Sequence, residues 1–140
     1  MPSALVIEDN AADVRQVSTI LNEIGFDQID LASTVPTALH LLDEVVEKKR
    51  PAPDLMVLDL SFGYESGFEV LRRWKSDQRL KPIRVIVWTQ MGEREQELCR
   101  LFGLQYVIPK WKGNRDLKLA VQKIMGGSQG GSQPPSEASL

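Results

Sequence analysis

Four short apolar runs, each leading to a polar residue, constrain the fold of this chain more than any other feature. The runs are residues 4–7, 55–58, 85–88 and 106–108, and longer segments of helical periodicity lie between them. Short apolar runs of this kind are typical of strands that are buried on both faces of a parallel sheet. The alternation therefore predicts an α/β fold with a doubly wound sheet.

Five strands and five helices account for the chain up to residue 125. We expect strands near residues 3–8, 28–32, 54–59, 83–88 and 105–108. Side chains that can accept a hydrogen bond from a free N–H group mark several helix starts, and glycines mark helix ends. On these signals we expect helices after Asn10, after Ser33 or Thr34, from Gly67, from Glu93 and after Asn114, with Gly25 and Gly103 as stops.

The length and composition exclude several classes of protein. A chain of 140 residues fits one domain, and 17 basic against 19 acidic residues favour neither nucleic acid nor an anionic membrane. The single cysteine, Cys99, excludes an internal disulfide framework and suits a reducing compartment. There is no secretory signal pattern and no run of about 18 apolar residues. We therefore expect a soluble, cytoplasmic protein without membrane insertion or direct nucleic-acid binding.

The end of the chain has a different composition. From Gly126 onward, glycine, serine, glutamine and proline dominate, and such a segment buries too little apolar surface to offset the entropy of ordering. We expect a folded domain over residues 1–125 and a disordered tail over residues 126–140.

The polar residues after the apolar runs point to a site. Ligands of open α/β sheets bind beyond the carboxyl ends of the strands, where the strand order reverses. With the strands in the order 2-1-3-4-5, that point lies between the first and third strands, which lead to Glu8, Asp9 and Asp59. Thr89 and Lys110 follow the next two strands. Three carboxylates, a hydroxyl and an ammonium group suit a divalent cation and a phosphoryl group.

This arrangement resembles the receiver domain of two-component response regulators. The resemblance covers residues 3–125 and rests on LVIEDN (5–10), PDLMVLDLSFGYESG (53–67), VIVWT (85–89) and GLQYVIPK (103–110). The spacings, 30 residues from Asp59 to Thr89 and 21 from Thr89 to Lys110, are also similar to those of the family. The resemblance implies a flavodoxin-like fold.

The resemblance also implies roles for the site residues. Asp59 is expected to be the phosphoacceptor, and Mg²⁺ is expected to be held by Glu8, Asp9, Asp59 and the backbone carbonyl of Ser61. Thr89 and Lys110 are expected to contact the phosphoryl group, and Thr89 is expected to shift toward it on activation.

The implied partners are proteins. A sensor histidine kinase or a phosphotransfer protein would donate the phosphoryl group, and an unknown protein would receive the signal. The chain would promote its own Mg²⁺-dependent phosphorylation and dephosphorylation without being a turnover enzyme, as a monomer or a phosphorylation-dependent dimer. The expected contact surface includes Arg94, Leu98, Gln105 and Tyr106.

Four residues depart from the family pattern. Gln90 replaces a small residue beside the phosphoryl pocket, and Val107 replaces a switch aromatic. Trp111 and Gly63 stand where prolines are frequent. Gln90, Val107 and Trp111 leave open an alternative, a receiver-like adaptor that works without phosphorylation. A phosphohydrolase with an aspartate nucleophile is a third possibility, but such enzymes usually carry a second aspartate where this chain has Ser61.

Overall fold

The computed structural model describes residues 2–62, 65–90 and 92–130. Its main sheet has the spatial order β2-β1-β3-β6-β7, and every neighbouring pair is parallel. The strands are β1 (Ser3–Ile7), β2 (Gln28–Ala32), β3 (Leu55–Leu58), β6 (Arg84–Thr89) and β7 (Val107–Pro109). Counted along the chain, these five strands have the order 2-1-3-4-5, which confirms the predicted flavodoxin-like sheet.

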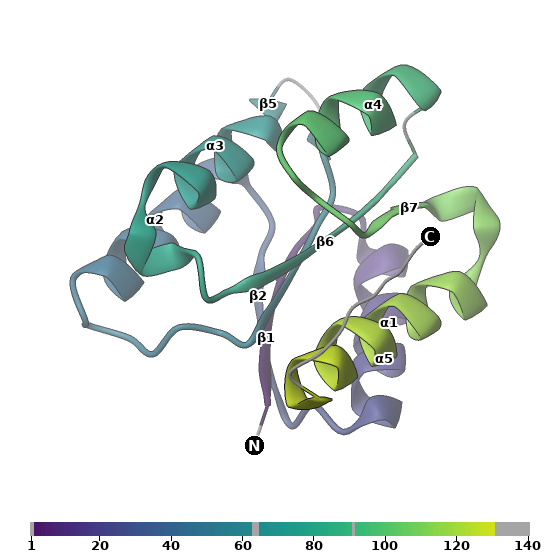
Figure 1. Ribbon diagram of the computed structural model, residues 1–140, viewed down its shortest axis with the longest axis horizontal. Coiled ribbons are helices and arrows are strands. Elements are labelled where there is room, and N and C mark those ends of the chain that lie inside the picture. The colour runs from purple at the N-terminus through teal and green to yellow at the C-terminus, as the bar shows by residue number, and fades with distance from the viewer. Residues whose placement is uncertain (1, 63–64, 91, 131–140) are drawn as a thin grey trace.

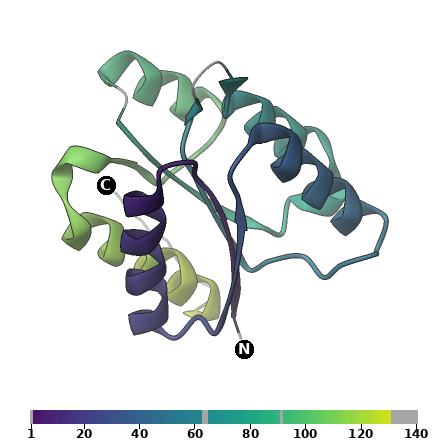
Figure 2. The same cartoon turned by 180° about the vertical axis from the view of Figure 1, so that it is seen from behind.

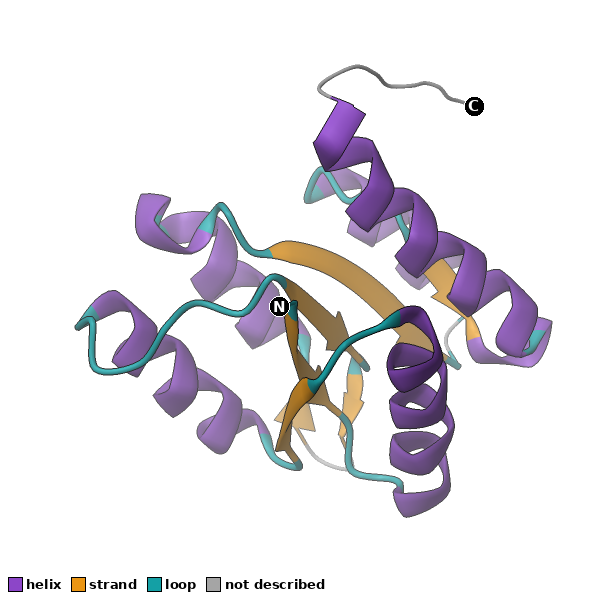
Figure 3. Ribbon diagram, turned by 90° about the horizontal axis from the view of Figure 1, so that it is seen from below, coloured by secondary structure: helices purple, strands orange, loops and turns teal. Residues whose placement is uncertain are grey.

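Helices cover both faces of this sheet. One face carries α1 (Ala11–Ile24) and α5 (Asn114–Gly130), and the other carries α2 (Val35–Val46), α3 (Phe68–Ser76) and α4 (Glu93–Leu101) (Figures 1 and 2). Figure 3 shows the strands lying between the two helical layers. The chain also contains two short 3₁₀ turns, η1 (Gln78–Leu80) and η2 (Lys110–Lys112). Within the described ranges, no helix combines the length and apolar character that a membrane crossing requires.

The strands supply two cores because successive strand residues point to opposite faces. In β1, Leu5 and Ile7 pack on the side of α2 and α3, whereas Ala4 and Val6 pack on the side of α1 and α5. The strands β3 and β6 alternate in the same way, and nearly every residue in these three strands is buried. The unbroken apolar runs of the sequence are explained by this two-sided burial.

The predicted helix ends are largely correct. The Asn10 side chain accepts a hydrogen bond from the Asp13 N–H at 2.9 Å, and Thr34 caps α2 through the Thr37 N–H at 3.1 Å. Gly25 ends α1 with φ at 124°, a conformation that favours glycine. Asn114 was predicted to precede the last helix, but it is the first residue of α5, and its side chain accepts a hydrogen bond from Gln16 of α1.

Two segments extend beyond the expected elements. The stretch after Asp59, predicted to be a loop, contains an antiparallel pair of short strands, β4 (Ser61–Phe62) and β5 (Glu65–Ser66); Gly63 lies outside the described residues. Helix α5 continues to Gly130, past the residue at which we placed the start of the tail. Residues 131–140 lie outside the described ranges, so the disordered tail stays a prediction.

Gly67 fixes the path of the chain after Asp59. Its N–H donates a hydrogen bond to the Leu60 carbonyl at 3.1 Å and closes the segment that contains β4 and β5. A Cβ atom at Gly67 would lie 2.5 Å from the Asp59 carbonyl oxygen and 2.8 Å from the Leu60 Cα. Any side chain here therefore pushes against the backbone of Asp59 itself.

We predict that Gly67→Ala lowers the free energy of unfolding by about 1–3 kcal/mol, the usual range for overpacking a buried site. Gly126→Ala is the matched control, because a Cβ there meets nothing within 4 Å and alanine favours the helix. Urea unfolding should show a lower midpoint for Gly67→Ala and an unchanged or higher midpoint for Gly126→Ala. Equal midpoints for Gly67→Ala and the wild type would contradict the packing described above.

Candidate functional site

The sheet places two acidic segments side by side. The Glu8 N–H donates a hydrogen bond to the Ala32 carbonyl, and the Asp59 N–H donates one to the Ile7 carbonyl, each at 3.0 Å. These bonds continue the ladders β1–β2 and β1–β3 by one residue past the strand ends. Glu8 and Asp59 are therefore held by the backbone of the sheet as well as by their side chains.

Three carboxylates meet at this edge, as the sequence predicted. Glu8, Asp9 and Asp59 each offer one oxygen, and these oxygens lie within 4.8 Å of one another. Glu8 and Asp59 are buried, with 2% and 5% of their surface exposed, whereas Asp9 is exposed. Like charges at this spacing repel unless a cation offsets them. The donor set consists of carboxylate oxygens alone, which fits a hard divalent cation such as Mg²⁺.

Asp59 is held from both sides. Its Oδ1 accepts hydrogen bonds from the Thr89 hydroxyl at 2.6 Å and from the Ser61 N–H at 3.1 Å. Its Oδ2 accepts one from the Lys110 ammonium group at 3.2 Å. Thr89, which is fully buried, thus already contacts Asp59, so the shift we expected on activation would start from this contact. The role of the Ser61 carbonyl in metal binding stays a prediction.

Lys110 contacts more carboxylates than the sequence indicated. Its ammonium group donates to Glu8 Oε1 at 2.7 Å and to Asp13 Oδ2 at 2.6 Å, in addition to Asp59. We did not single out Asp13. A signal was nevertheless present, because a helix that begins directly after Asp9 and Asn10 must place its first turn, and hence Asp13, beside the same edge of the sheet.

Burial and the neighbouring charges shift the pKa values of Glu8 and Lys110. Burial raises the pKa of Glu8 to about 7, the Asp59 charge adds to the rise, and the hydrogen bond from Lys110 opposes it. For Lys110, burial lowers the pKa, but hydrogen bonds to Asp13 and Glu8 outweigh that effect and raise the pKa above its ordinary value. Lys110 is therefore a permanent positive charge at neutral pH, whereas Glu8 titrates near neutrality.

Trp88 forms an apolar wall of the site. The Lys110 nitrogen lies 4.9 Å from the centre of its ring, within the range of a cation–π contact. The indole nitrogen is buried and has no hydrogen-bond partner among the described residues. The aromatic ring thus helps to keep the Lys110 ammonium group at the carboxylates, and the N–H groups of the ammonium stay available to donate to those carboxylates.

Three of the residues that depart from the family pattern lie in the described part of the structure. Gln90 is exposed, and Trp111 is exposed over 72% of its surface beside Lys112. Val107 packs with the core under α2 and α3, whereas Tyr106 packs on the opposite face of the sheet. The peptide bonds of the described residues are all trans, including the one before Trp111.

The predicted contact surface is only partly visible. Gln105 is exposed and Tyr106 is half-buried. The side chains of Arg94 and Leu98 lie outside the described part of the structure, so their place in a contact surface stays a prediction.

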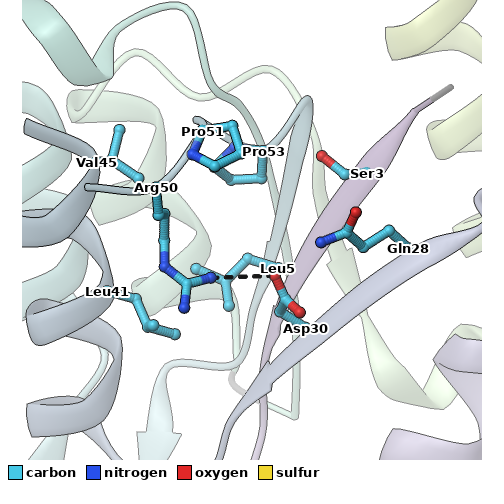
Figure 4. Close-up of a pocket in the computed structure, with 9 residues that line it drawn as sticks. All are labelled: Ser3, Leu5, Gln28, Asp30, Leu41, Val45, Arg50, Pro51 and Pro53. Carbon is cyan, nitrogen blue, oxygen red and sulfur yellow. Dashed lines mark hydrogen bonds and ion pairs between the residues drawn. The ribbon is translucent and has the colours of Figure 1, made fainter. Parts of the chain in front are cut away.

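A separate small cavity lies at the other end of the sheet (Figure 4). It has a volume of about 60 Å³ and opens beside the first residues of β1 and β2, Ser3 and Gln28. Arg50 crosses it and pairs with Asp30 at 3.3 Å and with Glu44 at 3.1 Å. Because the acidic residues follow the last residues of the strands, this cavity is not part of their site.

Comparison with known proteins assigns this geometry to a family. Residues 4–122 match the model of the response regulator receiver domain. The chain is 30% identical over 122 residues to the phosphate regulon transcriptional regulatory protein PhoB of Escherichia coli K12, covering 86% of this chain and 50% of PhoB. The chain thus spans about half the length of this curated relative.

Solved structures give the same assignment. The Mn²⁺-bound form of the response regulator Rcp1 is 26% identical with a TM-score of 0.75, covering 97% of this chain and 100% of Rcp1. The phosphorylated cyanobacterial phytochrome response regulator RcpA is also 26% identical with a TM-score of 0.75, covering 96% and 99% of the two chains. The matched residues include each of the four strand ends that build the acidic site, and the chain therefore belongs to the response regulator receiver domain family of two-component signal transduction.

Proposed function

We propose that this chain accepts a phosphoryl group on Asp59 from the phosphohistidine of a sensor histidine kinase or a phosphotransfer protein, with Mg²⁺, and signals through contacts with other proteins. The observation that carries this proposal is the Asp59 carboxylate, which is buried, bound by Thr89 and Lys110, and next to the Glu8 and Asp9 oxygens. The Mn²⁺-bound Rcp1 and the phosphorylated RcpA support it, because both are similar to this chain over almost its whole length.

The proposed reaction is a direct phosphoryl transfer. An Asp59 carboxylate oxygen attacks phosphorus and forms an O–P bond, while the P–N bond to the donor imidazole breaks. The nitrogen keeps the electron pair and takes a proton from solvent. Lys110 and Thr89 can donate to the phosphoryl oxygens, so the protein supplies position and charge rather than covalent chemistry. Water later attacks phosphorus and releases phosphate, which restores the free Asp59 carboxylate. We propose that this cycle serves to carry a signal rather than to turn over a substrate.

The metal set in this proposal is Glu8, Asp9 and Asp59, with the Ser61 backbone carbonyl. Mg²⁺ held by these oxygens would offset the negative charge that accumulates when a phosphoryl group approaches two buried carboxylates. We infer that the reaction takes place in the cytoplasm, and that a protein partner or a second copy of the chain reads the phosphorylated state.

A phosphorylation-independent adaptor remains the second candidate, because Val107 replaces the switch aromatic and Thr89 already contacts Asp59. Beryllofluoride with Mg²⁺ mimics an aspartyl phosphate and separates the two candidates. Under the leading proposal, its addition should change the amide NMR signals of β7 and α4 as well as those of the site. Signals that change only next to Asp59 would favour the adaptor.

We predict that a small phosphodonor such as phosphoramidate, with Mg²⁺, adds one phosphoryl group to the wild type and none to Asp59→Ala. The measurement is the intact protein mass after incubation. Asp30→Ala is the control, since this acid pairs with Arg50 beside the separate cavity, and its substitution should leave labelling unchanged. Equal labelling of Asp59→Ala and wild type would place the phosphoryl group elsewhere.

The raised pKa of Glu8 predicts a pH-dependent metal affinity. Below about pH 7 Glu8 carries a proton that must leave when its carboxylate binds a cation, so the affinity for Mg²⁺ should rise with pH. Calorimetric titrations should show tighter binding at pH 8 than at pH 6, by up to about tenfold per pH unit below the pKa. Glu8→Gln should bind more weakly, with little change over this range. A wild-type affinity that is constant from pH 6 to pH 8 would exclude Glu8 as a ligand with this pKa.

A further inference from the structure

The ammonium group of Lys110 has no free N–H group in this structure. An ammonium nitrogen carries three N–H donors and no acceptor. Three carboxylates take them: Asp13 at 2.6 Å, Glu8 at 2.7 Å and Asp59 at 3.2 Å. A phosphoryl group on Asp59 can therefore be bound by Lys110 only if one of these carboxylates gives up its hydrogen bond.

The three carboxylates are not equally easy to release. The Glu8 side chain is 2% exposed and would be left without this partner inside the protein, whereas Asp59, at 3.2 Å, is the residue that itself receives the phosphoryl group. The Asp13 side chain is 21% exposed, which lets water replace the ammonium group at its oxygens. Asp13 is also the partner that the proposed function assigns neither to the metal nor to the acceptor.

We propose that Asp13 is a positioning residue that holds the Lys110 ammonium group in the unphosphorylated protein and competes for it with the incoming phosphoryl group. This inference rests on the proposed function and deepens it. In the unmodified chain Asp13 and Glu8 keep Lys110 at the site, against the ring of Trp88. When the phosphoryl group arrives, the hydrogen bond to Asp13 is exchanged for one to a phosphoryl oxygen.

The negative charge of Asp13 also opposes the arrival of the phosphoryl group. Asp13 and Asp59 both lie within 3.2 Å of one nitrogen atom, so their carboxylates are close neighbours. A phosphodonor brings further negative charge to this place, and the Asp13 carboxylate repels it. Removing that charge without removing the side chain should therefore speed phosphorylation, although Lys110 loses one of its partners.

The test is Asp13→Asn, which keeps the size of the side chain. With acetyl phosphate and saturating Mg²⁺, the rate of phosphorylation should rise about three- to tenfold, as expected for the loss of one nearby charge. The increase should shrink at high salt, because the Asp13 charge is partly exposed to solvent. Asp13→Glu should restore a rate near that of the wild type, which a merely structural role in α1 does not predict.

The matched control is Glu23→Gln. Glu23 is an acid on the same helix, its only recorded partner among the described residues is Lys118 at 3.4 Å, and its substitution changes the net charge equally. Its rate should stay unchanged. If the wild type is labelled on Asp59 but Asp13→Asn is phosphorylated at the same rate or more slowly, the role of Asp13 is overturned and the proposed function is not. A wild type that takes up no phosphoryl group on Asp59 would overturn both the proposed function and this inference.

Discussion

The organising interaction of this protein is one buried ammonium group shared by three carboxylates. Lys110 neutralises only one of the negative charges at the edge of the sheet, where Glu8, Asp13 and Asp59 contact it and Asp9 lies nearby. Since uncompensated charge in a partly buried site is costly, such a cluster favours the binding of a cation. Burial raises the pKa of Glu8 to about 7, and the negative charge of Asp59 adds to the rise. The chemistry of the site follows from the excess of negative charge that the fold keeps at this edge of the sheet.

The backbone of the sheet keeps these carboxylates together. Glu8 and Asp59 continue the hydrogen-bond ladders of β1, and Thr89 is the last residue of β6, so the backbones of these three residues cannot move apart without disrupting the sheet. Gly67 packs against the carbonyl of Asp59 and leaves no space for a side chain. The apolar residues before each acid fill both cores, which ties the geometry of the site to the stability of the whole domain.

Much of this arrangement could be predicted from the sequence, because the apolar runs indicate the strands and the positions of the acids at the ends of these runs indicate the site. Runs buried on both faces indicate parallel strands, and parallel strands bring their carboxyl ends to one edge, so the meeting of Glu8, Asp9 and Asp59 followed from the order of the strands. Asp13 was missed because apolar periodicity does not identify polar residues of a first helical turn, although the helix start at Asn10 places that turn beside the site. The β4–β5 pair was missed because two-residue strands leave no periodic pattern. The contact between Thr89 and Asp59 depends on a side-chain rotamer, which the sequence does not specify.

The central claim is that three acids from two strand ends form one cation site at the phosphoacceptor. A crystal structure of the chain soaked with Mn²⁺ tests it most directly, because the anomalous scattering of manganese distinguishes the ion from a water molecule. The account predicts a single strong peak at coordination distance from oxygens of Glu8, Asp9 and Asp59, at roughly 2.0–2.6 Å for a hard cation. A peak elsewhere, or an ion that does not touch Asp59, would contradict it.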